Sequence, residues 1–77
     1  MNIQLKVIDM EMGTNKFVPL SEAQNWKWGD PRTVRVINGR QVHSFEKLTE
    51  MARFYENKGV SELTIYEAPS FMLLGGG

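Results

Sequence analysis

The stretch TVRVINGRQVH, residues 33–43, gives the strongest indication of the fold. Asn38 and Gly39 separate two short runs of β-prone residues. An Asn-Gly pair in that position favours a two-residue hairpin turn, because both central residues of the turn need a positive φ angle. The resulting register places Ile37 opposite Arg40, and residues 33–43 are therefore predicted to form two antiparallel strands.

Both faces of this hairpin are mixed in character. Alternation along the first strand puts Val34 and Val36 on one face and Arg35 and Ile37 on the other. Arg40 shares the second face, since it lies opposite Ile37. We expect the two valines to face the core and the two arginines to point away from it.

The segment after the hairpin predicts one amphipathic helix, from about residue 45 to residue 58. Ser44 is a favourable N-cap residue, and Gly59 can adopt the left-handed conformation that ends a helix. One face of this helix should pack on the sheet, because apolar residues recur there at helical spacing. They are Phe45, Leu48, Met51, Ala52 and Tyr55.

Three further segments have strand patterns of different strength. Ile3, Leu5 and Val7 alternate with polar residues, which is typical of a half-buried strand. Residues 17–20 suggest a weaker strand that is limited by a proline, and residues 63–66 suggest a closing strand.

These elements together predict a single α+β domain over residues 1–77, with residues 75–77 as a flexible tail. The sheet should be small and mainly antiparallel, with about four to five strands that include the hairpin at 33–43. The helix at about 45–58 should pack on one face of that sheet.

The composition argues against several kinds of site. The chain has 77 residues, nine basic and nine acidic residues, no cysteine and a single histidine, His43. Disulfides are therefore impossible, and a tetrahedral zinc site lacks its usual ligands. The longest apolar run, FMLL, is far shorter than the roughly 20 residues that span a bilayer. We expect a cytoplasmic protein with no cofactor, no metal and no membrane partner.

The stretch NWKWGDPRTVRVINGR, residues 25–40, is the best candidate for a binding surface. Residues 26–43 hold four cationic side chains and one acidic side chain, although the chain as a whole is neutral. Tryptophan and arginine are the residue types most enriched at interface hot spots. The predicted partner-binding residues are Trp26, Lys27, Trp28, Arg32, Arg35 and Arg40.

Two other interpretations of this stretch remain open. Aromatic rings interleaved with cations are also typical of surfaces that bind single-stranded nucleic acid. Alternatively, one or both indoles serve as core anchors in a domain that has little apolar area to bury.

The tail APSFMLLGGG predicts self-association. Four consecutive apolar residues seldom remain exposed on a small protein. They should add a strand, cover the open end of the core or pack against a second subunit. These residues are Phe71, Met72, Leu73 and Leu74.

The terminal glycines allow a further alternative. Ubiquitin-like and sulfur-carrier proteins end in a flexible Gly-Gly whose carboxylate is activated, and this chain ends in Gly75, Gly76 and Gly77. Those carriers place their helix between the first and second hairpins. Here two predicted strands follow the first hairpin before the helix begins.

The run VRVINGRQVHSFEKL…KGVSELTIY, within residues 34–66, resembles the second half of some bacterial PDZ domains. Both have a strand, an Asn-Gly turn, a second strand, a Ser-capped helix and a closing strand. The first half of the chain has no glycine-rich carboxylate-binding loop of the PDZ kind. The resemblance therefore implies a shared supersecondary arrangement, and it transfers no binding residue to this chain.

The sequence shows no catalytic motif. His43 has no cysteine beside it and no serine or aspartate at a diagnostic spacing, and phosphate loops and nucleophile elbows are missing. We therefore predict a non-enzymatic interaction module of the adaptor or inhibitor type. Its partner would be another protein, and it would also form homo-oligomers.

Overall fold

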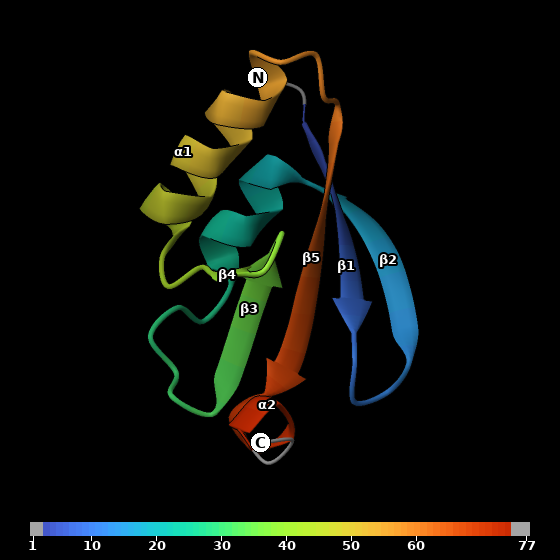
Figure 1. Cartoon of the computed structure of the whole chain (residues 1–77), viewed down its shortest axis with the longest axis vertical. Coiled ribbons are helices and arrows are strands. Elements are labelled where there is room, and N and C mark those ends of the chain that lie inside the picture. The colour runs from blue at the N-terminus through green and yellow to red at the C-terminus, as the bar shows by residue number, and fades with distance from the viewer. Residues whose placement is uncertain (1–2, 75–77) are drawn as a thin grey trace.

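The computed structural model describes residues 3–74, except for the side chains of residues 73 and 74 (Figure 1). The predicted flexible tail at 75–77 lies outside the described residues. Five strands, a 3₁₀-helix (η1) and two α-helices follow one another along the chain. Their bounds are β1 Gln4–Asp9, β2 Thr14–Pro19, η1 Leu20–Asn25, β3 Thr33–Ile37, β4 Arg40–Gln41, α1 Phe45–Glu56, β5 Glu62–Pro69 and α2 Ser70–Leu74.

The five strands form one mixed sheet in the order β2-β1-β5-β3-β4. β1 and β5 are parallel, and the other three neighbouring pairs are antiparallel. The predicted fold class is therefore confirmed: the protein has a small α+β fold with a mostly antiparallel sheet and one main helix.

The hairpin forms at the predicted turn. Asn38 and Gly39 have φ angles of 50° and 81°, and Ile37 pairs with Arg40. β4 is nevertheless only two residues long. After one more backbone bond, from the Val42 N–H to the Arg35 carbonyl at 2.8 Å, the chain leaves the sheet to begin α1.

The predicted helix is confirmed as α1, two residues shorter than expected at its C-terminal end. The Ser44 hydroxyl accepts a hydrogen bond from the Lys47 N–H at 3.1 Å, as an N-cap should. Leu48 and Ala52 are fully buried, while the other predicted apolar positions are half-buried. Gly59 has a φ of 87°, which ends the helical conformation.

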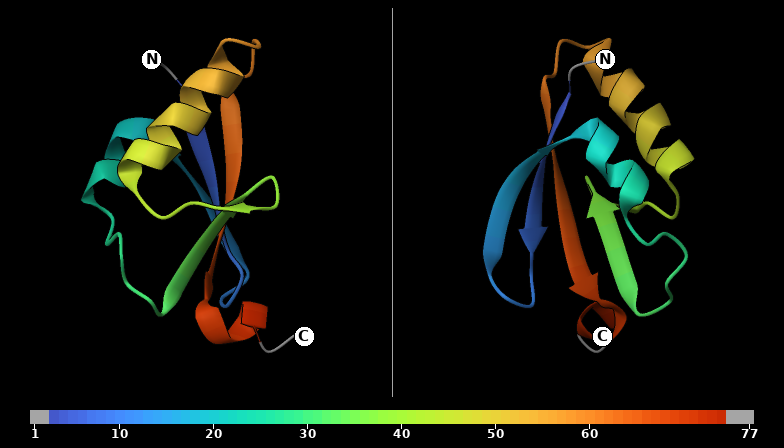
Figure 2. Two further views of the ribbon diagram at one scale, coloured as in Figure 1. Left: turned by 60° about the vertical axis from the view of Figure 1, so that its left-hand side comes forward. Right: turned by 180° about the vertical axis from the view of Figure 1, so that it is seen from behind.

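α1 and η1 lie together on one face of the sheet (Figure 2). Between them and the sheet lies a single core of buried apolar side chains, to which Ile3, Leu5 and Val7 contribute as predicted. We call the opposite side of the sheet the open face. Within the described residues, no helix has the length and apolar character needed to cross a membrane.

The predicted orientation of β3 is wrong. Ile37 and Arg35 point into the covered side, with exposed fractions of 0% and 9%, whereas Val34 and Val36 lie on the open face and are half-buried. The covered side accepts Arg35 because other groups there bind its guanidinium. A buried charge is tolerated when it is paired and hydrogen-bonded.

Candidate functional site

The two predicted tryptophans and Arg35 meet on the covered side of the sheet. The Cζ atom of Arg35 lies 5.2 Å from the Trp26 ring centroid and 4.7 Å from that of Trp28. The two ring centroids are 5.8 Å apart. Both distances from the cation are within the range of a cation–π interaction. We call Trp26, Trp28, Arg35 and its ion-pair partner Glu67 the Trp–Arg cluster.

Hydrogen bonds hold the cluster in place. Arg35 Nε donates to Glu67 Oε2 at 3.0 Å, and its Nη1 donates to the Lys27 carbonyl at 3.1 Å. Trp28 Nε1 donates to the Ala23 carbonyl at 2.8 Å. The cluster thus ties the loop after η1 to β3 and β5. Arg35 therefore contacts both indole rings, Glu67 and a backbone carbonyl at the same time.

The remaining predicted cations do not join the cluster. The side chain of Lys27 is exposed. Arg32 is 88% exposed and forms an ion pair with Asp30, with 3.3 Å between Nε and Oδ1. Arg40 lies at the other end of β3, beside α1. The structure therefore splits the predicted surface into a packed centre and three separate exposed cations.

Asp30 has a shifted pKa. The Arg32 backbone N–H donates to its carboxylate at 2.9 Å, and this bond is the main cause that lowers the pKa of Asp30 below 3.8. The Arg32 side chain acts in the same direction. The pair fixes the turn that leads into β3.

A cleft of about 310 Å³ lies beside the cluster, at the edge of the sheet where β4 stops. Trp28, Asp30, Arg35, His43 and Ser70 are among its lining residues. Within residues 3–74, no group of three or more His, Cys, Asp or Glu side chains is placed to hold a metal ion.

A second cavity, of about 510 Å³, separates the β3–β4 hairpin from α1. We call it the hairpin–helix groove. Met51, Phe54 and Tyr55 supply its apolar wall from α1, and the Tyr55 hydroxyl accepts a hydrogen bond from Asn38 Nδ2 at 2.6 Å. Its lining residues are Asn38, Arg40, Gln41, Lys47, Glu50, Met51, Phe54 and Tyr55.

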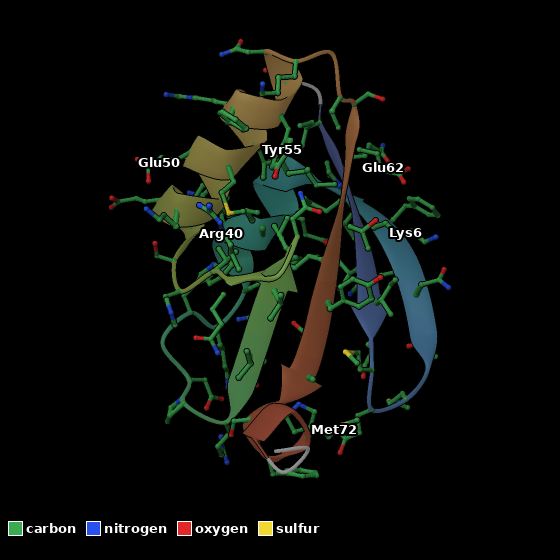
Figure 3. The ribbon with its side chains drawn as sticks, in the orientation of Figure 1. Lys6, Arg40, Glu50, Tyr55, Glu62 and Met72 are labelled. Atoms are coloured by element: carbon green, nitrogen blue, oxygen red, sulfur yellow. The ribbon has the colours of Figure 1, made fainter. Side chains whose placement is uncertain are left out.

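The charges around this groove are unequal. Lys47 and Glu50 lie 3.8 Å apart and largely neutralise each other. Arg40 has no ion-pair partner among the described side chains, and it lies over α1 between Glu50 and Tyr55 in Figure 3. The groove therefore combines an apolar wall with one uncompensated cation.

Phe54 is the most unusual residue of this groove. It lies beside the buried stripe of α1 and is 56% exposed. Its ring packs edge-on against Tyr55 with centroids 5.2 Å apart, and the Lys58 ammonium lies 4.9 Å from its centroid. These contacts orient the ring while leaving much of it accessible.

The open face carries an apolar patch near the C-terminal ends of β1 and β5. Strand alternation places its members on this side, and Ala68 is buried there outside the main core cluster. Four of them enclose a shallow apolar hollow of about 270 Å³. The open-face patch consists of Ile8, Met10, Val34, Val36, Tyr66 and Ala68.

The predicted self-association segment forms α2 at the end of this sheet. The Ser70 N–H donates to the Arg32 carbonyl at 2.8 Å, which carries the chain from β5 into the helix. Phe71 is 67% exposed and Met72 is 37% exposed. The segment therefore adds a helical turn, one outcome that the sequence did not suggest.

No protein-family model matches the chain, and the comparisons with curated proteins and with solved structures found no significant similarity.

Sequence reasoning missed Phe54, Tyr66 and Met10 as surface residues. Phe54 could have been found, since it is an apolar residue one step away from the core stripe of the predicted helix. Tyr66 and Met10 depend on which strands are neighbours, and the periodicity of a single segment does not contain that information.

Proposed function

We propose that this protein is a non-enzymatic interaction module that binds a segment of another protein in the hairpin–helix groove. The segment would present a large apolar side chain next to a carboxylate. The observation that carries this proposal is the pairing of exposed Phe54 with the uncompensated Arg40 across one groove.

The chemistry of the groove selects such a partner. An apolar side chain would cover Phe54 and Met51, which removes their exposed area from water. A carboxylate would meet the Arg40 guanidinium, whose planar donors match carboxylate geometry. The cavity volume of about 510 Å³ falls within the range of pockets that bind small ligands.

Of the predicted partner-binding residues, this proposal retains Arg40 as a binding residue. It assigns the Trp–Arg cluster a supporting role. A stacking surface for single-stranded nucleic acid needs accessible ring faces. Trp26 and Trp28 are half-buried and share Arg35 with each other, so the geometry favours a protein partner over nucleic acid.

A random peptide library displayed on phage tests the proposal. Selection on the wild-type protein should enrich sequences that place Asp or Glu beside an aromatic or long aliphatic residue. These peptides should bind Arg40→Gln about tenfold more weakly, which equals about 1.4 kcal/mol, because one charge-assisted contact is lost. Phe54→Ala should abolish detectable binding.

Two matched controls separate the groove from the rest of the surface. Arg53→Gln changes an exposed arginine of α1 outside the groove, and Phe17→Ala removes a ring that is 55% exposed on β2. Both variants should retain peptide binding. The proposal is wrong if the selected peptides bind Phe54→Ala as well as Phe17→Ala, or if selection enriches no acidic–apolar motif.

A further inference from the structure

The open-face patch is organised around the parallel pair β1 and β5. Ile8 lies beside Tyr66 in the register, and Lys6 lies beside Thr64. The Met10 N–H donates to the Glu67 carbonyl at 2.9 Å, which continues the ladder by one residue. Rows of outward side chains therefore run straight across β1 and β5 on this face.

The side chains of these rows can pack against the same rows of a second molecule. A two-fold axis that runs parallel to the strands, above the line between β1 and β5, would place β1 of one molecule over β5 of the other. Each Ile8 would then face the other molecule's Tyr66. Each Met10 would face an Ala68, so that a long side chain meets a small buried one. Such an isologous contact uses the same patch twice.

The charges at the border of the patch follow the same symmetry. Lys6 lies on β1 and Glu62 lies on β5, with Glu62 above Lys6 in the upper half of Figure 3. Neither has an ion-pair partner among the described side chains. The proposed axis would bring each Lys6 within side-chain reach of the other molecule's Glu62, because these residues differ by only one outward position along the strands. Two complementary ion pairs would result.

We infer that the open face binds a second copy of this chain and forms a two-fold dimer of stacked sheets. Aligned sheets pack about 10 Å apart with their inner side chains interdigitated, and their mean strand directions stay within about 30° of each other, as an axis along the strands requires. The centre of the patch has no charged side chain, as such packing requires. This surface differs from the hairpin–helix groove, and its role does not rest on the function proposed for that groove.

The oligomeric state of the full chain tests this inference. Sedimentation velocity over a concentration series should show a reversible dimer of the wild-type protein. Tyr66→Lys should raise the dimer dissociation constant by about a hundredfold or more, because it puts a charge into the apolar centre of the interface. Met12→Lys, which changes a side chain that is 74% exposed outside the patch, should leave the constant unchanged. Near-ultraviolet circular dichroism checks that both variants are folded.

Charge reversal gives a second test that does not disturb the apolar centre. Lys6→Glu and Glu62→Lys should each weaken the dimer several-fold, because like charges would then meet across the axis. The double variant should restore it. A wild-type protein that stays monomeric throughout the series overturns the inference, as does a dimer that neither Tyr66→Lys nor charge reversal weakens.

Discussion

The two faces of β3 differ in a way that reverses the usual distribution of residue types. On the covered side, Arg35 lies next to the core and is almost fully buried. On the open face, Val34 and Val36 remain partly exposed to solvent. The covered side can hold a charge because Glu67, a backbone carbonyl and two aromatic rings all bind it. Within residues 3–74, no helix lies over the open face (Figure 2), which is the basis for assigning it a partner.

The largest expected effect is a difference in unfolding free energy between alanine substitutions at two neighbouring residues of β3, one on each face. Ile37→Ala should cost about 3–4 kcal/mol of unfolding free energy, since it leaves a cavity in the packed core. Val36→Ala, on the open face, should cost about 1 kcal/mol or less, because its site is partly solvated. Urea denaturation of both variants measures the difference. Equal losses would mean that the open face is as tightly packed as the covered one.

Arg35→Ala should cost about 2–3 kcal/mol, because it leaves Glu67 without its ion-pair partner and removes the cation between the rings. The lower end of the range for breaking a buried pair applies, since the Glu67 side chain is 30% exposed. Arg35→Lys should lie between this variant and the wild type, because an ammonium cannot reproduce the planar fork.

Arg32→Ala is the matched control for this experiment. Its side chain is 88% exposed, and its loss should change the unfolding free energy by less than about 0.5 kcal/mol. If Arg35→Ala were equally mild and also reduced binding to a partner, the Trp–Arg cluster would be a binding surface, as the sequence suggested, and its supporting role would be refuted.

Local chemistry explains which elements the sequence could predict. The Asn38-Gly39 turn and the cap at Ser44 depend on interactions within a few residues, so their signals are contained in the local sequence. The buried stripe of α1 follows from periodicity alone. The same holds for Ile3, Leu5 and Val7, whose alternation places them in the core.

The orientation of β3 could not be predicted in this way. Both faces of the strand carry apolar residues, so alternation alone does not decide between them. The decisive contact joins Arg35 to Glu67, which is 32 positions further along the chain. A tertiary contact of this kind becomes visible only when β3 and β5 are known to be neighbours. The open-face patch was missed for the same reason, because three strands that are not consecutive supply it.

The smallest expected effect concerns Asp30 and Arg32, the exposed counterpart of the buried Arg35–Glu67 pair. The pKa of Asp30 is held below 3.8, mainly by the hydrogen bond from the Arg32 backbone N–H. The folded protein therefore binds fewer protons at this carboxyl than the unfolded chain. The resulting stabilisation is complete above the unfolded pKa and is lost as the pH falls through the lower folded value.

Urea denaturation of the wild type and Asp30→Asn should thus give a difference in unfolding free energy at about pH 6 that shrinks at about pH 3. Arg32→Ala keeps the backbone donor, so it should retain most of the Asp30 acid dependence. If the stability of Arg32→Ala lacked this acid dependence, the side-chain ion pair, and not the turn backbone, would hold the Asp30 carboxylate.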